Sequence, residues 1–165
     1  MSHLTIVQLS LEPIDKEEYI NEGSICEDTT FLRKTDYGGL PKEDPQEALE
    51  WLKEKLKPIG ELDIEARTLT LKSVPEIARL YHDCLEVPFF QFLTALREGV
   101  CKEFQLRTAI DEVGGLDDLF YINGYCHTAG MFLGDYINGD FHHGHEADLD
   151  APLTFHIGAL LDGHY

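Results

Sequence analysis

The sequence predicts an α+β fold with a mixed or mostly antiparallel sheet and two to four helices. Two amphipathic segments with clear start signals predict helices, and short segments rich in β-branched and aromatic residues predict strands. Beyond the glycine pair at 114–115, glycine, aromatic residues, acids and histidines become frequent, which predicts a C-terminal third rich in β-hairpins and loops. We expect one compact domain, 1–165, in which residues 1–110 and 111–165 could form sub-lobes.

The first forty residues contain short elements. Residues 3–11 are apolar and rich in β-formers, which predicts a strand buried on both faces. Asp15 is placed to cap a short helix over residues 16–21. Residues 29–33 fit a strand, whereas residues 37–41 have the composition of a turn.

A helix is predicted from Pro45 to about Lys57. Asp44 supplies the N-cap, proline takes the first helical position, and Glu47 follows three residues after the cap. Trp51 lies beside the apolar stripe of this helix, where we expect it to cover the core.

Two further segments have a regular pattern. Residues 62–71 fit a strand whose apolar phase shifts near Arg67, which indicates a bend or bulge. Residues 73–76 repeat the capping pattern and predict a second amphipathic helix, and residues 89–96 predict a third. Residues 101–111 alternate like a strand, although a helix also fits them.

One internal repeat lies in the C-terminal third. The segment Tyr121-Ile-Asn-Gly-Tyr-Cys-His127 recurs as Tyr136-Ile-Asn-Gly-Asp-Phe-His142. Asn-Gly between β-formers is a strong hairpin signal, because both central residues of a type I′ turn need a positive φ. The repeat therefore predicts two similar hairpins.

These hairpins would fix the partners of two histidines. With two-residue turns, Phe120 faces His127 in the first hairpin and Asp135 faces His142 in the second. The carboxylate of Asp135 would then hold one imidazole nitrogen of His142 and leave the other for a metal or a proton. Cys126 would point to the opposite face from His127, so the two cannot act as a nucleophile and its base.

Imidazole and carboxylate groups crowd this part of the chain, and both bind divalent metals. The candidate ligands for Zn, Mn or Fe are His127, His142, His143, His145 and Asp148, with Asp135 and Glu146 as orienting or basic side chains. Two other interpretations stay open: a solvated acidic loop with ordinary surface histidines, and a pH-responsive or partner-binding surface. Asp148 and Asp150 could also contribute to a calcium site, whereas His156 fits a satisfied histidine of a sheet.

The net charge of −18 is unevenly distributed. Residues 111–165 contain ten acids and no lysine or arginine. Such a field repels nucleic-acid phosphate, which argues against direct nucleic-acid binding and favours a basic protein surface as partner. Asp117 and Asp118, beside the glycine pair, are expected to lie in a solvated turn.

The sequence also bears on location. The longest apolar run falls far below the roughly 20 residues that a membrane span needs, and the first residues lack the features of a secretory signal. The four cysteines (Cys26, Cys84, Cys101 and Cys126) are widely spaced, as expected of reduced thiols. We therefore expect a cytoplasmic protein that does not bind membranes.

These observations favour a non-catalytic macromolecular binding or inhibitory domain that acts through an acidic face, since no complete catalytic motif is present. Its partner would be a basic protein surface, for example one that normally binds DNA, which the acids would mimic. Self-association through residues 153–165 is another option. The alternative is a metal-dependent, hydrolase-like enzyme that uses the C-terminal His/Asp cluster, with Glu146 or Asp135 as base.

Overall fold

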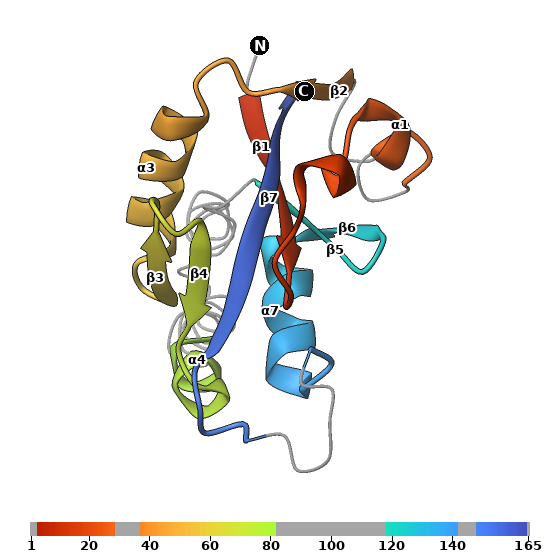
Figure 1. Cartoon of the computed structure of the whole chain (residues 1–165). Coiled ribbons are helices and arrows are strands. Elements are labelled where there is room, and N and C mark those ends of the chain that lie inside the picture. Colours follow the sequence, from red (N-terminus) through yellow and green to blue (C-terminus); the bar gives the residue numbers. More distant parts are fainter. Residues whose placement is uncertain (1–2, 29–36, 82–117, 142–147, 165) are drawn as a thin grey trace, which may run out of the picture.

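The structure, a computed structural model, describes residues 3–28, 37–81, 118–141 and 148–164. These residues form a seven-stranded mixed sheet, four α-helices and one short 3-10 helix (Figure 1). In chain order the elements are β1 (His3–Ser10), η1 (Lys16–Glu18), α1 (Glu22–Ile25), β2 (Tyr37–Pro41), α3 (Pro45–Leu56), β3 (Gly60–Asp63), β4 (Thr68–Leu71), α4 (Val74–Tyr81), β5 (Leu119–Ile122), β6 (Tyr125–Thr128), α7 (Ala129–Asn138) and β7 (Leu153–His164). The predicted α+β class is confirmed.

The strand order is β3-β4-β7-β1-β5-β6, with β2 also paired to β7. Only β1 and β5 run parallel among the described pairs, so the sheet is mixed but mostly antiparallel, as predicted. None of the described helices is long and apolar enough to span a lipid bilayer.

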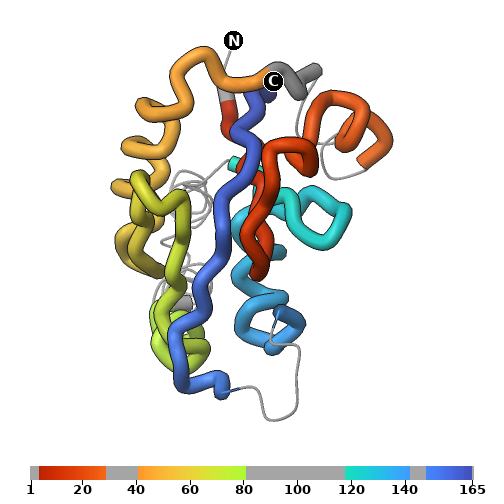
Figure 2. Tube along the Cα trace, in the orientation of Figure 1, coloured from red at the N-terminus to blue at the C-terminus, as the bar shows by residue number. Residues whose placement is uncertain are grey.

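Strand β7 lies at the centre of the sheet, and Figure 2 shows its long path through the middle of the fold. One edge of β7 pairs with β1 along nearly the whole length of that strand. The other edge pairs with β4 over residues 153–156 and with β2 over residues 161–164. The apolar segment 153–164 therefore joins the core of its own chain.

Arg67 fills the gap between β4 and β2 along that edge of β7. Its carbonyl accepts the N–H of Ile157 at 2.8 Å, and its Nε donates to the carbonyl of Ile157 at 3.2 Å. The guanidinium also donates to the carbonyl of Gly158. Backbone groups of β7 that neither neighbouring strand reaches are thus hydrogen-bonded to one residue.

The prediction of a single strand over residues 62–71 is wrong. The segment is a hairpin, in which β3 and β4 pair antiparallel from Gly60 opposite Leu71 to Asp63 opposite Thr68. Arg67 closes the connection with a φ of +51°, in the left-handed region. The shift in apolar phase marked a reversal of the chain rather than a bulge.

Strand β1 is buried on both faces, as predicted. Leu4 and Ile6 pack into a smaller apolar cluster, whereas Val7 and Leu9 pack into a larger one. The larger cluster takes side chains from α3, α4 and α7. Five of its rings stand in contact around β7: Phe120, Phe132, Tyr136, Phe141 and Phe155.

Gln8 ties β1 to two other segments where the register with β7 shifts between Val7 and Leu9. Its Oε1 accepts the N–H of Ile20 at 3.1 Å and the N–H of Ala159 at 3.0 Å, and its Nε2 donates to a carbonyl in η1. Gly158 makes room for this amide, because a Cβ there would lie 2.5 Å from Oε1. One side chain thus satisfies the backbone of an irregular stretch of the sheet.

The first hairpin of the repeat is confirmed. Strands β5 and β6 pair with Phe120 opposite His127 and with Ile122 opposite Tyr125. The turn residues Asn123 and Gly124 have φ values of +53° and +90°, which a type I′ turn requires.

The second predicted hairpin is wrong. Residues 129–138 form helix α7, which Thr128 caps by accepting the N–H of Met131. Phe132 and Tyr136 are buried one turn apart, which is the helical period. Gly139 still has a positive φ of +83°, but it ends a helix instead of forming a turn. The predicted cross-strand pair of Asp135 and His142 therefore does not form through a hairpin, and His142 lies outside the described residues.

The remaining element predictions have mixed outcomes. The helix beginning at Pro45 is confirmed as α3, with Asp44 accepting the N–H of Glu47, and the helix predicted after residues 73–76 is confirmed as α4. The helix predicted over 16–21 is shortened to η1, and α1 follows it. Residues 37–41 form strand β2 instead of a turn, because the long edge of β7 offers them a partner. The segments 29–33, 89–96 and 101–111 lie outside the described residues.

Candidate functional site

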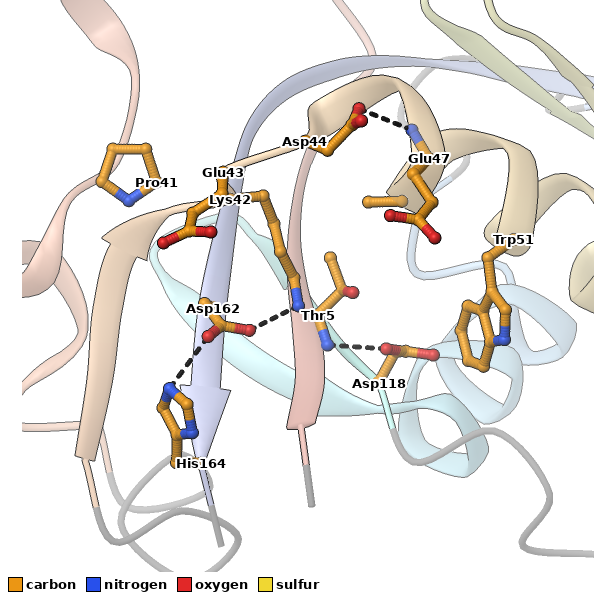
Figure 3. A pocket seen from close by; sticks show the side chains of 11 residues that line it. Thr5, Pro41, Lys42, Glu43, Asp44, Glu47, Trp51, Asp118, Asp162 and His164 are labelled. Carbon is orange, nitrogen blue, oxygen red and sulfur yellow. Dashed lines mark hydrogen bonds and ion pairs between the residues drawn. The ribbon is translucent and has the colours of Figure 1, made fainter. Parts of the chain in front are cut away.

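A cavity of about 860 Å³ opens between the start of α3 and one end of the sheet. Strands β1, β2 and β7 and the residue before β5 contribute its remaining walls, as Figure 3 shows. Its volume falls within the range of about 300–1,000 Å³ that is usual for ligand pockets. The described lining residues are Thr5, Pro41, Lys42, Glu43, Asp44, Glu47, Ala48, Trp51, Asp118, Asp162 and His164.

Asp118 is the most deeply buried acid of this lining. Only 2% of its surface is exposed, and its Oδ1 accepts the N–H of Thr5 at 2.7 Å. Its Oδ2 is also buried and has no hydrogen-bond partner in the described part of the chain. Burial raises the pKa of Asp118, although the N–H of Thr5 and the charge of Lys42 act in the opposite direction. A buried acid with a raised pKa in a cavity marks a candidate functional site.

Asp162 bridges the two basic side chains of the lining. Lys42 donates to its Oδ1, and Nε2 of His164 lies 2.9 Å from its Oδ2. The three residues come from the end of β2 and from β7, which pair at this end of the sheet. Asp162 thus neutralises Lys42 and orients His164.

Trp51 stands on the cavity side of α3 with 46% of its surface exposed. The prediction that it covers the core is wrong, because Leu49, Leu52 and Leu56 fill that role and leave the indole facing outward. Nζ of Lys55 lies 5.1 Å from the centroid of the ring. The indole therefore already attracts one cation.

The charge of the lining is strongly negative. Among the described lining residues, five carboxylates (Glu43, Asp44, Glu47, Asp118 and Asp162) face the single ammonium of Lys42. Thr5 and His164 are further polar residues of the described lining. Such a lining attracts cationic groups and repels anionic ones.

The structure brings together two of the residues that the sequence proposed as a metal site. Nδ1 of His127 lies 3.1 Å from Oδ2 of Asp135, although the geometry does not make a hydrogen bond. Asp135 thus approaches His127, where the sequence predicted His142. His142, His143, His145 and Glu146 lie outside the described residues. Asp148 is exposed and accepts the N–H of Asp150, and no group of three metal-binding side chains occurs among the described residues.

Cys126 and His127 point away from each other, as the strand pattern predicted. The thiol of Cys126 packs in the smaller apolar cluster, whereas the ring of His127 lies 6.5 Å from that of Phe141 in the larger one. Burial raises the pKa of Cys126 to about 12. The thiol therefore stays protonated and unreactive.

The prediction of a solvated turn at Asp118 is wrong. Its nearest described partner is Thr5, 113 residues earlier, so no local pattern reveals its burial. A weaker signal existed in β7, where Asp162 interrupts an apolar strand and therefore needs a partner. That partner, Lys42, lies 120 residues away in the sequence.

Comparison of the chain with protein-family models, with curated proteins and with solved structures gives no match. The function therefore has to be inferred from the geometry of the described residues.

Replacing Asp118 by asparagine should change how stability depends on pH. Since burial raises the pKa of Asp118, the stability linked to its protonation is present at low pH and is lost as the pH rises through the raised value. The variant lacks this loss. The difference in unfolding free energy between the variant and the wild type, measured by urea denaturation, should therefore shift in favour of the variant as the pH rises from about 4 to about 7.

The matched control is Glu65→Gln, which removes one exposed negative charge in the β3–β4 connection. It corrects for the loss of one negative charge in Asp118→Asn. A difference between Asp118→Asn and the wild type that stays constant with pH would contradict the burial of this carboxylate.

Proposed function

We propose that the protein is a non-catalytic binding domain whose acidic face takes up a basic segment of a partner protein and can thereby inhibit it. The observation that carries this proposal is the open cavity beside α3, whose described lining contains five carboxylates and one lysine. Exposed acids continue along the same helix at Glu50 and Glu54. A basic segment would meet these acids, which alternate with Lys53 and Lys55 along the helix, before it reaches the concave site.

The state of the basic side chains supports a binding role over a catalytic one. Lys42, the single ammonium of the described lining, is paired with Asp162 and is therefore poorly placed to stabilise an anionic substrate in this cavity. The net charge of −18 adds long-range attraction, which speeds the encounter with a basic partner.

The test is a titration with an oligolysine peptide, followed by the fluorescence of Trp51, the single tryptophan of the chain. We expect binding that weakens as NaCl increases from about 0.05 M to about 0.3 M, because salt screens the attraction. The double variant Glu43→Lys, Glu47→Lys should weaken binding about tenfold or more.

The control is Glu17→Lys, Glu22→Lys, which makes the same change in net charge on η1 and α1, outside the cavity lining. Its effect should stay below about threefold. Equal losses in both variants, or binding that is insensitive to salt, would contradict a site on this face.

A second candidate is a metal-dependent hydrolase that uses the predicted C-terminal cluster. The contact between His127 and Asp135 favours it, because a carboxylate beside Nδ1 leaves Nε2 for a metal. Elemental analysis of protein purified without chelator, with thermal melts in the presence and absence of EDTA, tests it. Stoichiometric Zn, Mn or Fe and a lower Tm in EDTA would favour this candidate, whereas metal-free protein that melts unchanged would remove it.

A further inference from the structure

We propose that the cavity holds the side chain of one lysine of the partner, with its ammonium bound to Oδ2 of Asp118 and its alkyl stem lying against Trp51. This inference rests on the proposed function and names the group that the site recognises. Four properties of the cavity support it. These are a carboxylate oxygen that has no described partner, an acidic lining, the hydrogen bond that Asp118 already accepts, and an exposed indole in the wall.

The acceptor is Oδ2 of Asp118. Leaving a buried polar atom without a hydrogen bond is unfavourable, and more so for a charged group. This oxygen is buried and lacks a partner in the described structure, and its residue lines an open cavity. A donor that reaches this oxygen from the cavity would satisfy it.

The charge of the lining decides the kind of donor. Lys42 is held by Asp162, so its charge is already neutralised. The carboxylates of Glu43, Asp44, Glu47 and Asp118 then lack a cation among the described lining residues. A cationic donor is attracted by all four carboxylates, whereas a neutral amide or hydroxyl gains only the hydrogen bond.

The geometry of Asp118 favours an ammonium over a guanidinium. Arginine binds a carboxylate best through two parallel hydrogen bonds, one to each oxygen. Oδ1 of Asp118 already accepts the N–H of Thr5 at 2.7 Å, which leaves one oxygen for the ligand. A lysine ammonium is a compact charge with rotatable donors and needs only one acceptor oxygen at this position.

Trp51 supplies the wall for the rest of the side chain. Figure 3 shows its indole and the carboxylate of Asp118 among the side chains that line the same cavity. The four methylenes of a lysine can cover an aromatic ring while the charged end reaches further, and the ring also attracts the charge. Nζ of Lys55 already lies 5.1 Å from the centroid of this ring, so the stem of the partner's lysine would share the indole with that ammonium.

The experiment compares oligolysine, oligoarginine of equal length and free cadaverine by calorimetry and by the fluorescence of Trp51 in the full chain. We expect oligolysine to bind the wild type more tightly than oligoarginine does, and cadaverine to bind far more weakly than either peptide. Asp118→Asn should weaken oligolysine binding about tenfold or more, which is the loss of a hydrogen bond to a charged group. The control Glu65→Gln should change it less than about twofold.

Each outcome separates this inference from the proposed function. If Asp118→Asn binds oligolysine as the wild type does while Glu43→Lys, Glu47→Lys binds it weakly, the acidic face stands and the lysine site is overturned. Tighter binding of oligoarginine, or cadaverine binding as tight as that of the peptide, also overturns it. If neither peptide binds the wild type, the proposed function itself fails.

Discussion

Replacing Phe155 by alanine should lower the unfolding free energy by about 3–5 kcal/mol, the range found when a large buried aromatic residue is truncated. Phe155 is fully buried on β7 and stands between three other rings. Its centroid lies 5.5 Å from that of Phe132, 5.7 Å from that of Phe141 and 6.5 Å from that of Tyr136. Truncation would leave a cavity lined by rigid rings, which cannot collapse to fill it.

Urea denaturation followed by circular dichroism measures this loss. Phe155→Leu, which keeps much of the volume, should lose less than half as much. Tyr125→Ala is the control, because that tyrosine is 68% exposed and its truncation should change stability by about 0.5 kcal/mol. A loss below about 1.5 kcal/mol for Phe155→Ala would show that these rings do not form a packed cluster.

Replacing Gln8 by methionine should cost about 3 kcal/mol or more, although the two side chains have nearly the same shape. The substitution leaves the N–H groups of Ile20 and Ala159 without their acceptor, and each buried unpaired donor costs about 1–3 kcal/mol. It also removes the bond from Nε2 to the carbonyl of Glu18, through which η1 is attached to β1.

Hydrogen exchange makes this prediction specific. The amides of Ile20 and Ala159 should exchange faster in Gln8→Met by a larger factor than other amides of β1 and β7. The control is Gln46→Met on the exposed side of α3, where the amide bonds only to the side chain of Glu50 and the expected change is within about 0.5 kcal/mol. A uniform increase in exchange across the sheet would refute a local role for this amide.

Local signals predicted several elements correctly, namely β1, α3, α4 and the first hairpin. The first hairpin follows from Asn123-Gly124 together with its flanking residues, because the turn residues adopt a positive φ and the flanking residues favour strands. The start of α3 follows from Asp44 and Pro45 in the same way. Each prediction depends on contacts within a few residues, so one sequence is enough to make it.

The same signal failed in its second copy for a physical reason. Asn138-Gly139 also favours positive φ values, but a helix C-cap uses only the one at Gly139, whereas a hairpin turn would use both. The choice depends on the residues before it, where Phe132 and Tyr136 follow the helical period and Thr128 provides a cap. A turn residue specifies a backbone angle, and its neighbours specify which element uses it.

The cavity could not be predicted in this way. Its ion pair joins Lys42 to Asp162, and its buried acid is held by Thr5, so its geometry arises from residues more than 100 positions apart. Local patterns indicated an acidic chain and, through the exclusion of nucleic acid, a basic partner. They placed the site in the histidine-rich segment, whereas the described structure builds its cavity around β7 and α3.

The central position of β7 has a consequence for synthesis on the ribosome. When residues 1–152 have been made, every other described strand exists, but β1, β2 and β4 still lack the neighbour that joins them. Only the hairpins β3–β4 and β5–β6, and the pairing of β1 with β5, can form before β7 emerges. Until then the nascent chain presents open apolar strand edges, which are prone to aggregation. The high negative charge of the chain would reduce such aggregation, because incomplete chains repel one another electrostatically.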